Sequence, residues 1–252
     1  MDKKTDLAVR YQNELNLVPL KEFNAKEMDL FFALCARMKE RGLDNVRFSF
    51  EELKELSEYK FTGNDRFVHD LENVYQKMIS MSYRTDEINE DGDRVIKRFV
   101  LFTGFEINVS KMFVDVSVNP KLDYIINGLT TEVSRFELSA FTSIRSTYAK
   151  TLFRLLMQYR STGYYIVRIE DFKERMDIPE SYRQMGQIDQ KVLQPALREL
   201  QNYFRDLKVT KIKAKKGNKI AKLEFTFSGL KTNKPRIPMG SVAKFSKESI
   251  LS

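Results

Sequence analysis

Residues 148–176 of the chain read YAKTLFRLLMQYRSTGYYIVRIEDFKERM and predict a helix, a strand and a second helix in succession. From Tyr148 to Arg160 apolar side chains recur at helical spacing, and Gly163 follows as a residue that ends helices. Residues 164–168 form the predicted strand, and Glu170 begins a helix that continues through Met176. The rest of the chain can be compared with this order.

The same order occurs in the first half of the chain. Residues 25–41 have the apolar stripe of a helix with Asn24 as its N-cap, residues 46–50 read as a strand, and a helix starts at Glu51. Aligning Gly163 with Gly42 places Phe153 on Phe32, and after a gap of two residues Glu170-Asp171-Phe172 falls on Glu51-Glu52-Leu53. Two matching blocks in the same order predict a duplicated unit.

Each half continues with a third helix and a hairpin. In the first half the helix spans about 65–80 with Asn64 as its cap, and residues 83–105 form two strand-like runs around the turn 89–93. In the second half the helix spans about 187–203, where Pro195 predicts either a kink or a later start, and residues 209–227 form a hairpin around 215–218. Helix, strand, helix, helix, hairpin is the order of a winged helix, a variant of the helix-turn-helix.

The predicted fold is therefore α+β, with two tandem winged-helix domains and β-hairpin wings. We expect an N-terminal domain at residues 1–135, a C-terminal domain at 136–230 and a flexible basic tail at 231–252. Between the two units, a strand-like run at 113–118 and a short helical piece at 122–126 are expected to complete the first domain.

Charge is distributed unevenly along the chain. The net charge is +8, but residues 1–140 hold 20 Lys/Arg against 25 Asp/Glu (net −5), and residues 141–252 hold 23 against 10 (net +13). This asymmetry favours a C-terminal half that binds a polyanion, with a membrane surface as the weaker alternative because the C-terminal helices need their apolar faces for a core. No apolar run approaches the ~18–20 residues that span a bilayer, and the polar start lacks a secretory signal, so we expect a cytoplasmic protein without a membrane partner.

The sequence offers little for catalysis or metal binding. Cys35 and His69 are the single cysteine and the single histidine, so neither an internal disulfide nor a Cys/His zinc site can be completed. Cys35 is expected to fill the core, and His69 to be an ordinary surface or half-buried residue. An enzyme that nicks DNA through a tyrosine would need paired histidines to hold its metal, and the sequence has one histidine. A nucleotide hydrolase would need a G-x-x-x-x-G-K-S/T loop, which is absent from the sequence. We therefore expect no catalytic residues, no metal, no cofactor and no enzymatic activity.

The second unit carries the candidate DNA-binding residues. Arg, Gln and Lys side chains on a helix in the major groove can pair with base edges, whereas hairpin lysines bind phosphates. The candidates on or just before the third helix are Tyr182, Arg183, Gln187, Gln190, Lys191, Gln194 and Arg198. The candidates in the hairpin are Lys211, Lys213, Lys215, Lys216 and Lys219. Strand alternation places Lys211, Lys213 and Lys215 on the face opposite Ile212 and Ala214.

Other cations are weaker candidates. Arg145, Lys150 and Arg154 flank the first helix of the second unit and are expected to add phosphate contacts. In the first unit, Asn64 and Arg66, with Lys97 and Arg98, are candidates for a secondary DNA contact. The first hairpin is acidic and repels phosphate, so protein contacts suit this unit better.

Three stretches of the sequence resemble the iteron-type plasmid replication initiators. They are Asn13-Glu14-Leu15, residues 148–159 with the following Gly163, and the run VLQPALREL at 192–200, which is similar to the proline-containing recognition helix of that family. The resemblance covers about residues 8–228. It implies two winged helices, readout of repeated origin DNA (iterons) by the third helix of the second unit, and dimerisation or remodelling through the first unit.

The resemblance also implies partners. Initiators of this family bind double-stranded origin DNA as monomers, open the origin and recruit host replication proteins such as the helicase, the helicase loader or the initiator, and as dimers they often repress their own gene. The acidic first hairpin departs from a DNA-binding wing. A winged-helix transcriptional regulator without a role in replication remains the alternative, because both classes need the same groove-reading surface.

Overall fold

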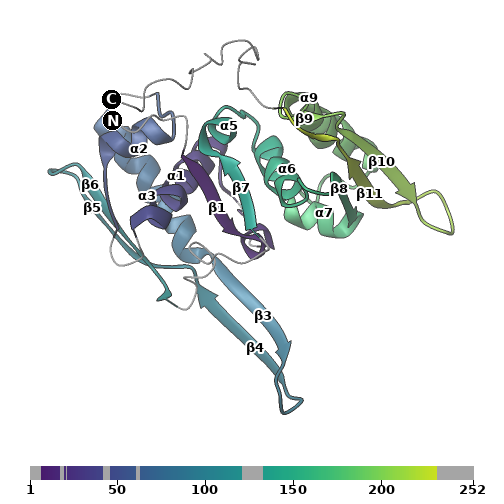
Figure 1. Cartoon of the computed structure of the whole chain (residues 1–252), viewed down its shortest axis with the longest axis horizontal. Helices are drawn as coiled ribbons and strands as arrows, with labels where there is room; N and C mark the ends of the chain where they lie inside the picture. The colour runs from purple at the N-terminus through teal and green to yellow at the C-terminus, as the bar shows by residue number, and fades with distance from the viewer. Residues whose placement is uncertain are drawn as a thin grey trace, which may run out of the picture.

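The computed structural model describes residues 7–17, 20, 22–41, 46–60, 63–120 and 133–231, and it contains two sets of elements in the same order (Figure 1). The first unit consists of α1 (Ala25–Arg41), β2 (Val46–Ser49), α2 (Phe50–Leu56), α3 (Asn64–Ser80), β5 (Phe102–Asn108) and β6 (Phe113–Val118). The second unit consists of α6 (Thr147–Gln158), β8 (Tyr164–Arg168), α7 (Ile169–Arg175), α8 (Met185–Ile188), η4 (Asp189–Leu193), α9 (Gln194–Leu200), β10 (Lys208–Lys213) and β11 (Ile220–Thr226). The predicted duplication and both strand positions are confirmed.

The two units have equivalent antiparallel sheets. In the first unit β6 lies between β2 and β5, and in the second unit β11 lies between β8 and β10. Phe48 pairs with Val114 in one sheet, as Val167 pairs with Leu223 in the other. The hairpin β5–β6 is therefore the wing of the first unit, in the position that β10–β11 has in the second.

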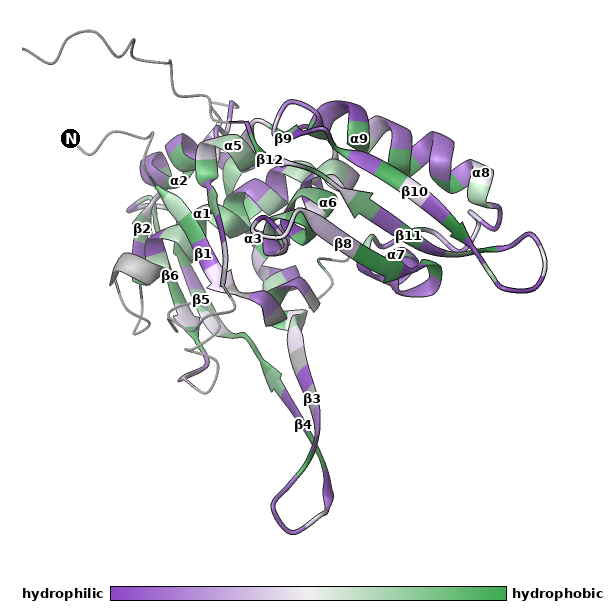
Figure 2. Cartoon of the chain, turned by 45° about the vertical axis from the view of Figure 1, so that its right-hand side comes forward, coloured by the Kyte–Doolittle hydropathy of each residue, from purple (hydrophilic) through white to green (hydrophobic). Residues whose placement is uncertain are grey.

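The prediction that residues 83–105 form the first wing is wrong. This segment contains a separate hairpin, β3 (Ser82–Ile88) and β4 (Arg94–Val100), whose strands pair only with each other and project from the body (Figures 1 and 2). Its turn lies at the predicted place, because the Asn89 side chain accepts hydrogen bonds from the amides of Asp91 and Asp93. We call this hairpin the arm. The acidic residues expected in the first wing lie in the arm instead.

Of the two predicted N-caps, Asn24 caps α1 as expected, whereas Asn64 does not cap α3. The side chain of Asn24 accepts from the amides of Lys26 and Glu27, and the Glu27 carboxylate accepts from the Asn24 amide, so α1 begins with the predicted cap. Asn64 is instead the first residue of α3, and Gly63 is its N-cap. The Asn64 side chain is engaged elsewhere, because its oxygen accepts from Lys54 Nζ at 2.7 Å.

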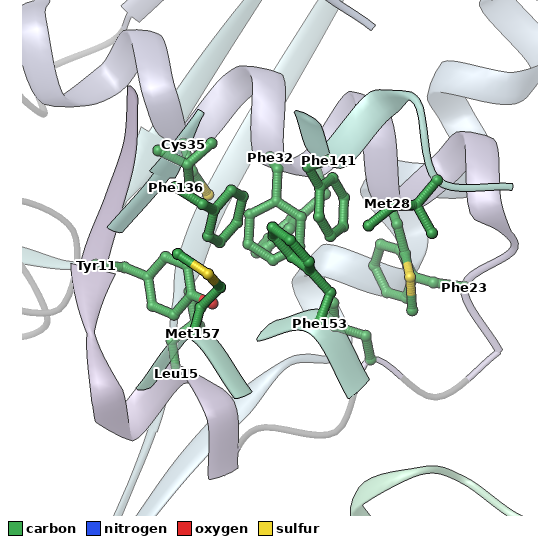
Figure 3. Packing of buried hydrophobic residues seen from close by; sticks show 14 of the residues in the cluster. Tyr11, Leu15, Phe23, Met28, Phe32, Cys35, Phe136, Phe141, Phe153 and Met157 are labelled. Atoms are coloured by element: carbon green, nitrogen blue, oxygen red, sulfur yellow. The ribbon is translucent and has the colours of Figure 1, made fainter. Parts of the chain in front are cut away.

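A single hydrophobic core joins the two units (Figure 3). The strands β1 (Ala8–Gln12) and β7 (Val133–Glu137) pair with each other, and η2 (Asn13–Leu17) and α5 (Leu138–Thr142) follow them along the chain. The ring centroids of Phe32 and Phe141 are 4.7 Å apart, and those of Phe136 and Phe153 are 5.4 Å apart. Cys35 is fully buried in this core, and burial raises the pKa of its thiol to about 12, so its predicted role as a core filler is confirmed.

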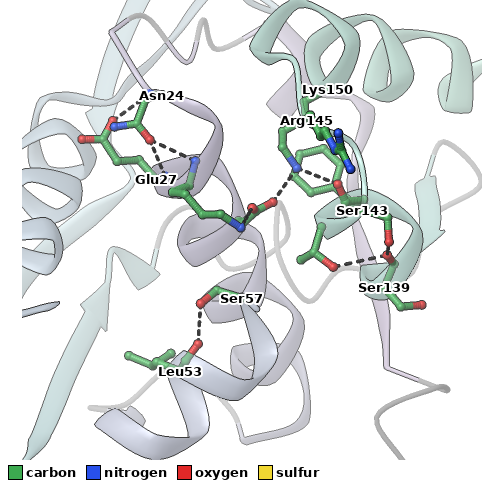
Figure 4. A network of polar contacts seen from close by, with 12 residues as sticks. Asn24, Glu27, Leu53, Ser57, Ser139, Ser143, Arg145 and Lys150 are labelled. Atoms are coloured by element: carbon green, nitrogen blue, oxygen red, sulfur yellow. Dashed lines mark hydrogen bonds and ion pairs between the residues drawn. The ribbon is translucent and has the colours of Figure 1, made fainter. Parts of the chain in front are cut away.

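Two cations of α6 lie inside the same junction, which corrects the prediction that they contact phosphates. Lys150 is fully buried and forms an ion pair with Asp29 of α1 at 2.5 Å, and its Nζ also donates to the carbonyl of Phe141 at 2.6 Å (Figure 4). Arg154 is also buried and donates to the carbonyl of Leu15 at 3.1 Å. Neither side chain can reach a DNA backbone from these positions. Both hold the two units together.

α6 ends at Gln158 with Tyr159 as its C-cap, two residues before the predicted end, and Gly163 lies in the turn that follows. Its φ is +66°, in the left-handed region that favours glycine, and a Cβ at this position would lie 2.1 Å from the carbonyl oxygen of Phe227. The carbonyl of Gly163 accepts from the amide of Phe227 at 2.9 Å. The turn after α6 is thereby tied to the residue that follows β11.

The chain leaves the second unit through a short strand pair, β9 (Phe204–Arg205) with β12 (Gly229–Leu230). The predicted helical piece at 122–126, Gly42 and nearly all of the predicted tail lie outside the described residues. Within the described ranges, no helix combines the length and the apolar character needed to cross a bilayer.

Candidate nucleic-acid interface

The third helix of the second unit is one continuous helix made of α8, η4 and α9. Its inward face matches the prediction: Ile188, Val192, Leu193, Ala196, Leu197 and Leu200 are all buried. The helix begins at Met185 and ends at Leu200, two residues before the predicted start and three before the predicted end. Burial of this face fixes which side chains the helix presents to solvent. We call it the recognition helix.

Pro195 is accommodated by a π-helical turn rather than by a sharp kink or a late start. In η4 the amide of Gln194 donates to the carbonyl of Asp189, five residues earlier. Proline has no amide hydrogen and crowds the carbonyl four residues before it, so a wider turn at this position relieves the conflict. Gln190 and Gln194, on this turn and at its end, are both exposed.

The outward face carries the predicted reading residues. Arg183, Gln190, Lys191, Gln194 and Arg198 are exposed, and Tyr182 and Gln187 are half-buried. Lys191 Nζ lies 4.6 Å from the centroid of the Tyr182 ring, a cation–π contact that orients the lysine. The Gln187 side-chain oxygen accepts from the Gln184 amide at 3.1 Å, so this residue also caps the helix.

The wing of the second unit is cationic at its turn. Lys213, Lys215, Lys216 and Lys219 are exposed there, and Lys213 donates to the Asn218 side chain at 3.4 Å. The predicted lysine face needs one correction. Lys211 pairs with Leu223, and Ile212 pairs with Lys222, so Lys211 shares the inward face of the sheet.

Lys211 points toward the recognition helix because an acid lies there. Its Nζ forms an ion pair with Asp189 at 2.8 Å, and the other carboxylate oxygen of Asp189 accepts from Gln194 Nε2 at 3.4 Å. Asp189 therefore links the wing, the π-helical turn and a predicted reading residue. Asp189 is not among the residues predicted from the sequence, although it is the one acidic residue between Arg183 and Arg198.

The start of α6 is tied to the end of the recognition helix. The backbone amides of Arg145 and Ser146 donate to the two carboxylate oxygens of Glu199. The Arg145 side chain remains exposed. It is the one predicted cation near α6 that stays available to a phosphate, since Lys150 and Arg154 are buried.

The first unit places its candidates beside its own wing. Asn64 and Arg66 are exposed on the first turn of α3, and Asn64 Nδ2 lies 3.6 Å from Met112 Sδ in the wing turn. That turn, residues 109–112, contains Lys111 and no acid.

The remaining candidates of the first unit lie elsewhere. His69 is exposed on α3, as expected for a surface histidine. Lys97 lies in the arm and forms an ion pair with Glu87 at 3.2 Å. In the part of the chain that the structure describes, no three His, Cys, Asp or Glu side chains gather as a metal site.

Comparison with known proteins agrees with this arrangement. The family model "Initiator Replication protein, WH1" matches residues 8–157, and "Initiator Rep protein, WH2" matches residues 168–227. A relative from Bifidobacterium longum (strain NCC 2705) named "Probable replication protein rep" is 33% identical over 193 residues, which are 76% of this chain and 63% of the relative. The chain thus spans less than two thirds of that relative's length.

The fold is also that of a solved initiator. The crystal structure of Pi initiator protein in complex with iteron DNA superposes with a TM-score of 0.69 and 17% identity, covering 93% of this chain and 100% of that chain. The two predicted tandem winged-helix domains and the predicted family are confirmed. The chain belongs to the family of initiator replication proteins, which have two winged-helix domains.

Proposed function

We propose that the protein is a plasmid replication initiator that binds repeated origin DNA. The observation that carries this proposal is the outward face of the recognition helix, where Gln190, Lys191, Gln194 and Arg198 are exposed next to a cationic wing. The name of the Bifidobacterium relative and the iteron DNA bound by Pi initiator support the same function.

The recognition helix reads bases and the wing binds the backbone. Purine edges can be paired in a bidentate manner by the side chains of Gln190, Gln194 and Arg198. Helix-turn-helix proteins direct the N-terminal part of this helix into the major groove, and that part holds Arg183, Gln187 and Lys191. Tyr182 orients Lys191. The phosphate contacts come from Arg145, Lys213, Lys215, Lys216 and Lys219, while Lys211 positions the wing through Asp189 and adds charge.

The first unit contributes a secondary DNA contact and protein contacts. Asn64 and Arg66 lie beside a wing turn without acids, so this unit is better suited to DNA than its predicted acidic wing implied. We place the boundary between the domains near residue 135. The bound initiator opens the origin, recruits host replication proteins and represses its own gene as a dimer, all in the cytoplasm and without a catalytic step or cofactor.

Removal of one reading side chain tests the proposal. Gln190→Ala or Arg198→Ala will weaken binding to a repeat-containing duplex by about 1–3 kcal/mol, because alanine cannot form the bidentate hydrogen bonds to a base. Affinity for a random duplex will change little after Gln190→Ala, since glutamine carries no charge. Fluorescence anisotropy with both duplexes measures the two affinities.

The matched control is Gln201→Ala, at an exposed position just after α9. It removes the same side chain beyond the reading face and will leave specific affinity unchanged. Equal reductions in the Gln190 and Gln201 variants, or no reduction at Gln190 and Arg198, would show that this helix face does not read the repeat.

A further inference from the structure

Three arginines meet on the outer face of the strand pair between the two units. The antiparallel register of β1 and β7 places Arg10 directly opposite Arg135, whereas Val9 and Phe136 face the core. Arg160, just after α6, donates from Nη1 to the carbonyl of Arg135 at 3.2 Å. Because cross-strand partners have Cβ atoms about 4.5–5.5 Å apart, the side chains of Arg10 and Arg135 leave the sheet beside each other, and the charges of both act on Arg160.

This cluster has no neutralising partner among the described side chains. None of the three arginines forms an ion pair with a described side chain. The acid on the same face of the strand pair is Glu137, which lies opposite Ala8 and also forms no ion pair. Like charges directly opposite each other destabilise a strand pair. Burial, and then the charges of Arg135 and Arg10, lower the pKa of Arg160. The fold carries an electrostatic cost at this site that an anion would remove.

The place of the cluster indicates which anion. β1 packs on α1 of the first unit and β7 on α6 of the second, so the cluster lies at the seam between the units (Figure 1). A duplex held by both units has to cross the seam between them. Planar guanidinium groups match the oxygens of a phosphate in a bidentate manner.

We propose that Arg10, Arg135 and Arg160 form a phosphate-binding patch that holds the DNA backbone where it passes from one winged helix to the other. The proposal rests on the proposed function and adds a binding site that no reading residue supplies. Phosphate contacts fix the register and orientation of a protein on the duplex without reading its sequence. The patch thus sets how the two units sit on one repeat.

The test replaces all three arginines with glutamine and measures the salt dependence of binding. The slope of log K against log salt will fall by about 0.9 for each phosphate that the variant no longer binds, for a repeat-containing and a random duplex alike. The ratio of the two affinities will stay as in the wild type. The thermal midpoint will not fall, because repulsion between the arginines is removed.

The control is the arm variant, in which Arg84 and Arg94 of the arm, neither of them a predicted DNA contact, are changed to glutamine. It removes two positive charges from a hairpin that projects away from the body, and its salt slope will stay within error of the wild type. Equal slopes for the patch variant and the wild type overturn the patch while leaving the proposed function standing. Wild-type protein that binds no duplex overturns both. An altered sedimentation coefficient with an unchanged slope assigns the patch to protein association and contradicts the proposal.

Discussion

Replacing Lys150 with methionine will lower the free energy of unfolding by about 3–5 kcal/mol, because the change leaves the buried carboxyl group of Asp29 without its partner. Asp29 is almost fully buried, and burial raises the pKa of its carboxyl group to about 6 in spite of the neighbouring Lys150 and Lys26. Lys26 is partly exposed and lies 3.2 Å from the other carboxylate oxygen, so it compensates for only part of the effect. Urea unfolding followed by circular dichroism measures the change.

Two variants distinguish the ion pair from a general effect of lysine removal. Lys222→Met changes an exposed lysine of β11 and will alter stability by less than about 0.5 kcal/mol. The double variant Lys150→Met with Asp29→Leu replaces both charges by apolar groups and will regain most of the stability. Wild-type stability in the single variant Lys150→Met would contradict the assignment of this pair as the polar link between the units.

Replacing Lys213, Lys215 and Lys216 with alanine will weaken binding to every duplex. If each lysine binds one phosphate, the slope of log K against log salt falls by about 2.7, which corresponds to roughly 100-fold weaker binding at about 0.15 M salt. Preference for the repeat over random DNA will persist, because the exposed face of the recognition helix is untouched. Titrations over a range of salt concentrations give both quantities.

Lys211 does not belong to that set, because its ion pair with Asp189 gives it a different role. The arm variant serves as the control here too, and its slope will match the wild type. If the wing variant and the arm variant had the same slope, the wing would not lie along the DNA backbone.

The second unit could be predicted well because its local signals agree with its packing. Apolar spacing located α6 and the recognition helix, Gly163 marked the turn between α6 and β8, and Lys215-Lys216-Gly217-Asn218 marked the wing turn. Each signal depends on neighbouring residues alone. The outward residues of the recognition helix could be predicted in the same way, because the apolar positions identify the buried face and the remaining positions form the exposed face.

The first wing could not be located from local signals. The arm has a stronger turn sequence, Asn89 to Asp93, than the true wing has at residues 109–112, so turn chemistry selected the inserted hairpin. Only pairing of β2 with β6 distinguishes the two hairpins, and β2 and β6 are more than 60 residues apart.

The buried cations of α6 were missed for a related reason. Lysine and arginine on a helix usually face solvent. The apolar residues of α6 itself, however, occur on nearly all sides of the helix, which is the pattern of a helix buried in a core. That pattern was available in the sequence and could have placed Lys150 and Arg154 inside. Their partners, Asp29 and the carbonyl of Leu15, come from the first unit and depend on how the units dock.

A base-resolved footprint of the protein on the DNA that flanks its own gene decides whether the recognition helix reads repeated origin DNA. We expect protection of major-groove bases in tandem direct repeats, with one protein on each repeat, and the Arg198→Ala variant will need a concentration roughly 5- to 150-fold higher for the same protection, in line with a loss of about 1–3 kcal/mol. Protection of a single inverted repeat by a dimer, or no protected repeat at all, would show that the protein is not an initiator of this kind.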